Sequence, residues 1–71
     1  MTRAAGEEIR LTGRERDVLE LLAAGLQLEV IAQRLGIGLE TVRTHVRKAS
    51  ARLGAANRTQ AVAIAIRRGL I

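Results

Sequence analysis

The residues best suited to chemistry in this sequence are polar and cationic side chains in the stretch 40–51. Arg43 and Arg47 stand four residues apart, so on a helix their guanidinium groups project from the same face. Each guanidinium can donate two hydrogen bonds to O6 and N7 of guanine in the major groove of DNA. Thr44 can contact a thymine methyl group, and Glu40 can accept a hydrogen bond from the cytosine amine. The stretch therefore has the chemistry of a base-reading surface.

Charge is distributed unevenly along the 71 residues. Positions 1–40 hold five Arg and seven acids, a net charge of −2, whereas positions 41–71 hold seven basic residues and no acid, a net charge of +7. A positive block of this kind suits phosphate backbones or anionic membranes, although it can also serve solubility alone. Membrane binding is the weaker interpretation, because Arg67 and Arg68 cluster at one end of the last segment instead of lining a polar face. Lys48 and the Thr41 hydroxyl are placed for phosphate contacts, which fix the register of a protein on DNA.

The composition excludes several classes of site. The sequence has no Cys, so disulfides, thiolate metal sites and cysteine nucleophiles are absent. It has no aromatic residue and thus lacks the usual stacking surfaces for single-stranded nucleic acid and for small ligands. His45 is the single histidine and has no partners for catalysis or metal binding. We therefore expect no enzyme activity, no metal, no cofactor and no small-molecule ligand within this domain.

Four helices are expected to position the polar residues, at about 12–24, 28–35, 39–53 and 58–68. Helix 12–24 opens with a capping box formed by Thr12 and Glu15, and Asn57 with Gln60 repeats this pattern before helix 58–68. Helix 39–53 has one apolar face, opposite the cationic one, formed by Val42, Val46, Ala49 and Leu53. The short turn 36–38, with Ile37 as an apolar plug, completes the outline of a helix-turn-helix. These features predict an all-α, four-helix domain over residues 11–71.

The ends of the chain carry less information. Residues 1–10 lack apolar periodicity and are interpreted as a linker or flexible N-terminal tail. The longest apolar run, 61–66, is too short to cross a bilayer, and no secretory signal is visible. We therefore expect a cytoplasmic protein without membrane contact.

Several motifs, in order and at matching spacing, resemble the LuxR-type (FixJ/GerE-type) helix-turn-helix. They are Leu11–Leu19, Ile31–Ile37, Thr41–Val46, Arg52–Gly54 and Asn57–Val62. The resemblance covers Leu11–Ile71 and implies the DNA-binding domain of a bacterial transcription regulator, in which an upstream receiver (as in response regulators) or ligand-sensing domain usually controls it. It implies double-stranded DNA as partner, a homodimer on DNA, and RNA polymerase as a candidate second partner.

The resemblance also implies roles for individual residues. The expected base-contacting residues are Arg43, Thr44 and Arg47, with Glu40 included in some members. The expected phosphate-contacting residues are Gln27, Thr41, Lys48 and Arg58. In relatives the last helix forms the dimer interface. Here we expect Val62, Ile66 and Leu70 to face the core, and the dimer interface to consist of Ala61, Ile64 and Arg68.

Two other interpretations remain open from the sequence. A sigma-factor-like DNA-reading domain shares the Thr-Val-Arg start of the recognition helix, although the segment 57–71 favours the LuxR type. A helix-turn-helix repurposed for protein–protein interaction, with weak DNA binding, is favoured by the acid Glu29 near the expected phosphates. It is also favoured by three additional apolar residues, Leu28, Val30 and Leu39.

Overall fold

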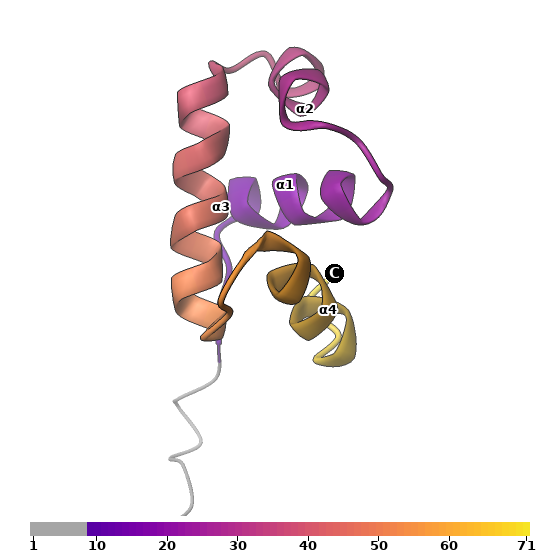
Figure 1. Cartoon of the computed structure of the whole chain (residues 1–71), viewed down its shortest axis with the longest axis vertical. Coiled ribbons are helices and arrows are strands. Elements are labelled where there is room, and N and C mark those ends of the chain that lie inside the picture. The colour runs from indigo at the N-terminus through magenta and orange to yellow at the C-terminus, as the bar shows by residue number, and fades with distance from the viewer. Residues whose placement is uncertain (1–8) are drawn as a thin grey trace, which may run out of the picture.

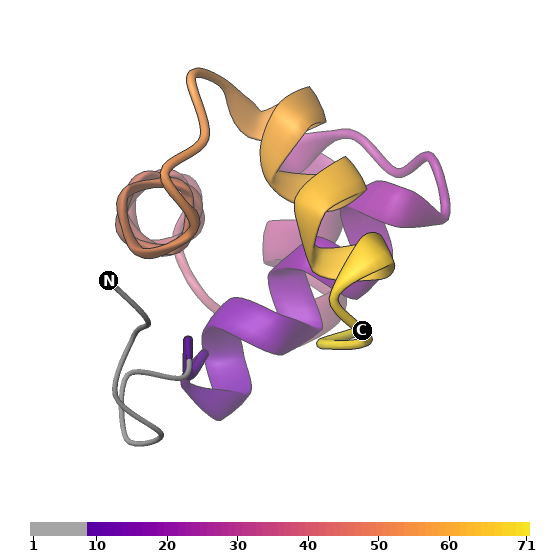
Figure 2. The same ribbon diagram turned by 90° about the horizontal axis from the view of Figure 1, so that it is seen from below.

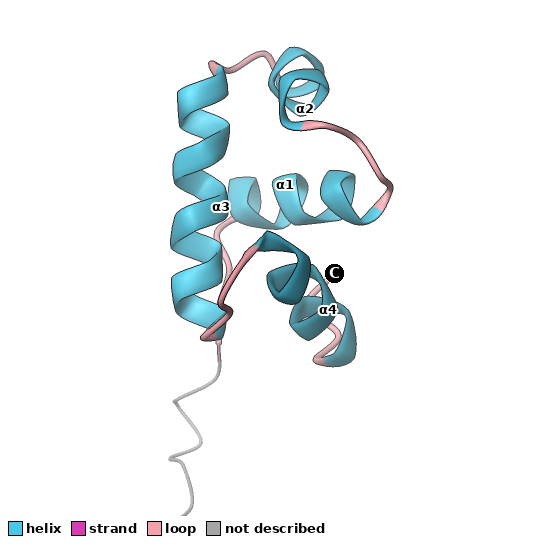
Figure 3. Ribbon diagram, viewed as in Figure 1, coloured by secondary structure: helices cyan, strands magenta, loops and turns pink. Residues whose placement is uncertain are grey.

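The computed structural model describes residues 9–71, which form four α-helices joined by short loops (Figures 1 and 3). The helices are α1 (Gly13–Ala23), α2 (Leu28–Leu35), α3 (Leu39–Leu53) and α4 (Arg58–Arg67). These bounds confirm the four helices expected from the sequence. The tail expected over residues 1–10 lies almost wholly outside the described residues. Ile9, however, is half-buried and packs against the core, so the packed domain begins before the expected position 11.

The longest helix, α3, and the first helix, α1, each contact all the other helices, whereas α2 and α4 do not contact each other. α1 lies across the middle of α3, with α2 on one side of α1 and α4 on the other (Figure 1). Viewed nearly along α3, the other helices lie to one side of it, and its opposite side is open (Figure 2). Within residues 9–71, no helix is both long enough and apolar enough to cross a membrane.

The apolar face of α3 is buried as predicted. Val42 and Ala49 are fully buried, Leu53 is nearly so, and Val46 is half-buried. Val42 belongs to a core cluster shared with α1 and α2, whereas Ala49 and Leu53 belong to a second cluster shared with α1 and α4. Ile37 packs against the first cluster from the turn between α2 and α3, as expected of an apolar plug. The turn is entered through Gly36, whose φ of 69° lies in the left-handed region that favours glycine.

The face of α4 that packs on the core differs from the prediction. Ala61 and Ala65 are fully buried, Ile64 is half-buried against the core, and Ile66 is 54% exposed. The prediction of Ile66 on the core face and Ile64 on the free face was therefore wrong. Alanine explains the difference, because a row of methyl groups lets a helix approach its neighbours closely while larger side chains lie at the flanks.

The two predicted capping boxes differ in detail. At α1 both bonds form: the Glu15 N–H donates to Thr12 Oγ1 at 3.1 Å, and the Thr12 N–H donates to Glu15 Oε1 at 3.0 Å. At α4 the Gln60 N–H donates to Asn57 Oδ1 at 2.8 Å. The Gln60 side chain, however, accepts from the Ala56 N–H, one residue before the expected partner. Both helices therefore have a capped start, although the second cap is not reciprocal.

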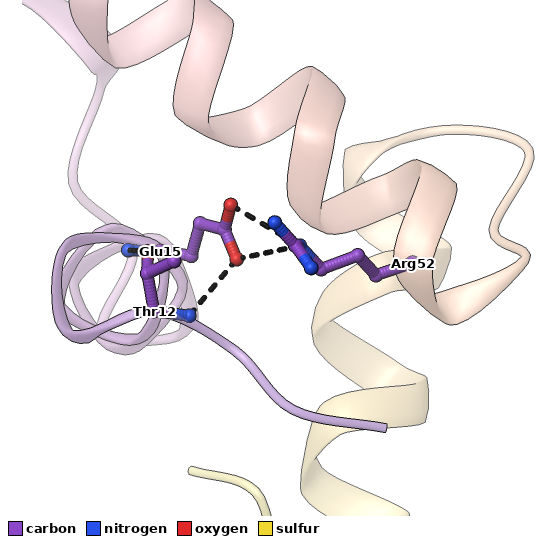
Figure 4. A network of polar contacts seen from close by, with 3 residues as sticks. All are labelled: Thr12, Glu15 and Arg52. Atoms are coloured by element: carbon purple, nitrogen blue, oxygen red, sulfur yellow. Dashed lines mark hydrogen bonds and ion pairs between the residues drawn. The ribbon is translucent and has the colours of Figure 1, made fainter. Parts of the chain in front are cut away.

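Glu15 also makes an ion pair that the sequence did not predict. Its side chain is only 1% exposed, and Arg52 Nε, in the last turn of α3, lies 3.1 Å from Glu15 Oε1 (Figure 4). The two residues are 37 positions apart in the chain, so no local pattern connects them. The carboxylate thus joins the start of α1 to the end of α3.

We expect Arg52→Met to lower the free energy of unfolding by about 1–3 kcal/mol, because it leaves a buried carboxylate without its charged partner while keeping the aliphatic stem. The half-exposed position of Arg52 keeps the effect below that of a fully buried pair. Urea denaturation measures it, with Arg14→Met as the matched control, since Arg14 pairs with Asp17 at the surface. Equal losses in the two variants would contradict a special role for the Glu15 pair.

Candidate nucleic-acid interface

The exposed face of α3 carries all the residues predicted to contact bases. Arg43, Arg47 and Glu40 are exposed, and Thr44 is half-buried between them. This face lies opposite Val42 and the other buried residues, so packing of the apolar face holds the polar one outward. Two residues predicted to contact phosphate, Thr41 and Lys48, are exposed on the same helix. His45 is half-buried at the border between the two faces.

The polar residues of this face form two pairs along the helix. Arg43 Nε lies 3.6 Å from Glu40 Oε2 in an exposed ion pair. One turn further on, Arg47 Nη2 donates a hydrogen bond to Thr44 Oγ1 at 3.4 Å. Both pairs have a spacing of three residues, which places side chains next to each other on a helix. This spacing is the signal from which the pairs could have been predicted. Each guanidinium is thus positioned by a neighbouring side chain of α3. Its remaining N–H groups can still donate hydrogen bonds to a ligand.

Two open clefts flank this helix and share arginine residues. The first, which we call the α2–α4 cleft, is lined by Gln27, Glu29, Arg43, Arg58 and neighbouring residues. It brings together one predicted base-contacting residue, Arg43, and two predicted phosphate-contacting residues, Gln27 and Arg58. The second cleft, between α3 and the loop that leads to α4, is lined by Arg43, Arg47, Arg58 and residues around them. Four of the predicted residues, Gln27, Arg43, Arg47 and Arg58, therefore line two adjoining clefts, whereas Thr41 and Lys48 line neither.

Two helix starts in this surface suit anionic groups. Gln27 is the N-cap of α2 and makes no side-chain cap, and Arg58 is the first residue of α4. Backbone N–H groups at a helix start, together with the helix dipole, favour a negative charge nearby. The exposed acid Glu29, in the first turn of α2, weakens this effect in the α2–α4 cleft. The surface is thus cationic overall, with two acids within it, Glu29 in the cleft and Glu40 beside Arg43.

The residues predicted for a dimer interface do not share one free face. Ala61 is fully buried in the core cluster, so its side chain is unavailable to a partner in this structure. Ile64 is half-buried, and Arg68 is exposed at the end of α4. The exposed face of α4 instead carries Thr59, Ala63 and Ile66. The burial of Ala61 argues against a direct contact with a partner, while the interface roles of Ile64 and Arg68 stay predictions.

The additional apolar residues of the sequence do not form a joint patch. Leu28 is half-buried and packs against the core cluster around Val42. Leu39 is also half-buried, and only Val30 is exposed, at 38%. Leu28, one of the three residues that favoured an interaction module, thus contributes to core packing.

Comparison with known proteins assigns this chain to a family. Residues 10–65 match the family model of bacterial regulatory proteins, luxR family. The chain belongs to the luxR family. The transcriptional regulatory protein YxjL of Bacillus subtilis is 45% identical over 60 residues, which cover 84% of this chain and 28% of YxjL. The chain spans less than a third of the length of the curated relatives that it matches first.

Solved LuxR-type structures share the fold. The transcription factor GerE superposes with a TM-score of 0.80 at 37% identity, over 83% of this chain and 88% of GerE. VqmA of Vibrio cholerae, a LuxR-type receptor described as a dimer without its target DNA, has a TM-score of 0.85 at 34% identity. That match covers 94% of this chain and 30% of VqmA. The predicted LuxR-type fold is confirmed, in preference to the sigma-factor alternative, and the matched relatives are transcription regulators. The domain is the DNA-binding helix-turn-helix of a LuxR-family regulator.

We expect Glu29→Gln to tighten binding to duplex DNA by about two- to fivefold, the range of one exposed charge interaction, because it removes an acid from the cleft lined by the predicted phosphate contacts Gln27 and Arg58. The plot of log affinity against log salt should also become steeper. Fluorescence anisotropy over a salt series measures both quantities. Glu20→Gln, which removes an exposed acid from α1, is the control for net charge alone. An equal gain in both variants would place Glu29 away from the DNA.

Proposed function

We propose that the LuxR-type domain binds double-stranded DNA sequence-specifically by placing α3 in the major groove. The observation that carries this proposal is the division of α3 into a buried apolar face and an exposed face bearing Arg43, Thr44 and Arg47. An α-helix fits the major groove, where the two guanidinium groups can donate to guanine O6 and N7. Thr44 is half-buried and accepts a hydrogen bond from Arg47. Its side chain can contact a thymine methyl group.

The phosphate contacts of this proposal come from three helices. Thr41 and Lys48 lie on α3, while Gln27 and Arg58 lie at the starts of α2 and α4. The α2–α4 cleft supports this assignment, because Gln27 and Arg58 line it together with Arg43. Phosphate contacts on both sides of a groove-bound helix would fix its register without adding sequence information.

The proposal includes a homodimer through the exposed face of α4. Ile66 is 54% exposed there, flanked by the small residues Thr59 and Ala63, so a second α4 can approach closely. The dimer described for VqmA supports dimerisation in this family without assigning the interface here. In a two-fold dimer the two α3 helices would face half-sites about 34–36 Å apart, one turn of DNA.

The role of the whole protein is a further part of the proposal. The regulators that match this chain support control of transcription. RNA polymerase enters the proposal as a candidate partner of the complete regulator. A domain that binds the chromosome of a bacterium acts in the cytoplasm. Because the chain spans less than a third of these relatives, it supplies the DNA-reading part of that role.

We expect Arg43→Ala to relax preference at one base position and to cost about 1–3 kcal/mol on the preferred site. Lys48→Ala, the matched control, should weaken binding to all sequences alike and lower the salt slope by about 1. Selection of bound sites from a random duplex library, followed by titration of each variant, measures both effects. Unchanged base preference in Arg43→Ala would remove Arg43 as a reader.

We expect Ile66→Glu to weaken binding to a site with two half-sites by at least about tenfold, because it places a charge in the proposed dimer contact and removes cooperative binding. The monomer should stay folded, since Ile66 is exposed. Sedimentation and titration against single and double half-sites measure the effect. Ala23→Glu, which adds the same charge at an exposed position on α1, is the matched control. Unchanged sedimentation and unchanged affinity for the double site would exclude this interface.

A further inference from the structure

We infer that Glu40 is a specificity-determining residue that positions Arg43 for base reading and disfavours its use on phosphates. This inference rests on the proposed role of Arg43 as a base reader. It differs from the sequence-based expectation, in which Glu40 itself contacts a cytosine. The observation that carries it is the ion pair in which Glu40 Oε2 lies 3.6 Å from Arg43 Nε.

The atom that Glu40 engages leaves the reading end of Arg43 free. A guanidinium carries five N–H donors, one on Nε and four on the two terminal nitrogens. Because the carboxylate lies at Nε, the terminal fork can still donate both of its hydrogen bonds to guanine O6 and N7. The ion pair therefore need not break when Arg43 reads a base. It also restricts the rotation of a long side chain that is 53% exposed, which reduces the ordering required on binding.

The same carboxylate opposes contact between Arg43 and a phosphate. Glu40 is 87% exposed, so a phosphate that approaches the Arg43 guanidinium meets a second negative charge directly beside it. A guanine edge carries acceptor atoms but no net charge, and it is repelled far less. Arg43 also lines the α2–α4 cleft with Arg58, where a free guanidinium would join the phosphate contacts. Glu40 thus reserves Arg43 for bases.

The strengths of the two interactions agree with a role of Arg43 at bases and not at phosphates. A bidentate contact to the correct base discriminates by about 5- to 150-fold. An exposed ion pair contributes at most about fivefold. The ion pair between Glu40 and Arg43 is therefore too weak to prevent base reading. Its effect on affinity is nevertheless comparable to that of one additional phosphate contact.

The test compares Glu40→Gln with wild type on the selected DNA site and on unrelated duplex of equal length. We expect binding to unrelated duplex to rise about two- to fivefold, with a salt slope steeper by about 1, while binding to the selected site changes less. The ratio of the two affinities should therefore fall. The matched control is Asp17→Asn, which removes the acid of another exposed pair with the same spacing, on α1. The control should leave the ratio unchanged.

A second pair of variants separates this effect from net charge. In an Arg43→Ala background, Glu40→Gln should no longer change the ratio, because the residue through which it acts is absent. Persistence of the full change in that background would overturn the inference, as would a loss of preference confined to one cytosine. If Arg43→Ala alone leaves base preference intact, the proposed reading by α3 fails as well. If Arg43→Ala relaxes the preference but Glu40→Gln behaves like Asp17→Asn, only the role of Glu40 fails.

Discussion

The ion pair of the buried Glu15 carboxylate is the interaction on which the placement of α3, the helix proposed to read bases, depends. This carboxylate belongs to the only charged side chain within residues 9–71 that is buried, and it accepts from the Thr12 N–H and pairs with Arg52 at the end of α3. A domain this small gains only a few kcal/mol from its apolar core, and four of the nine buried apolar residues within residues 9–71 are alanines. One ion pair between α1 and α3 is therefore a large share of the total stability.

The fold uses α3 as both a core element and a binding element. Its apolar face joins two core clusters, one towards α2 and one towards α4, so the helix is fixed along its whole length. The starts of α2 and α4 then lie beside the same exposed surface, where Gln27 and Arg58 line one cleft with Arg43. The acids within this surface moderate its charge: Glu29 in the cleft, and Glu40 on Arg43. Attraction to phosphates is thus limited, while the donors for base edges stay available.

Patterns among neighbouring residues predicted most of the fold. Contacts between residues far apart in the chain could not be predicted from the sequence. Thr12 with Glu15, and glycines such as Gly36, mark helix ends through neighbouring residues, so the helix bounds were predicted well. The two faces of α3 were predicted because apolar and polar residues separate cleanly on it. In α4 alanine and larger apolar residues alternate, so more than one face can be buried, and the choice depends on how closely α1 and α3 approach. The pairing of Glu15 with Arg52 spans 37 positions and follows from the tertiary fold alone.

Chemical interference at guanine N7 tests the central claim, that α3 reads bases in the major groove, most directly. Dimethyl sulfate methylates this atom, which is one of the two acceptors proposed for Arg43 and Arg47. Duplexes modified before binding and then separated into bound and free fractions should show depletion of methylated guanines from the bound fraction at defined positions in each half-site. Arg43→Ala should abolish the depletion at one of them. Equal methylation of the bound and free fractions would contradict the account.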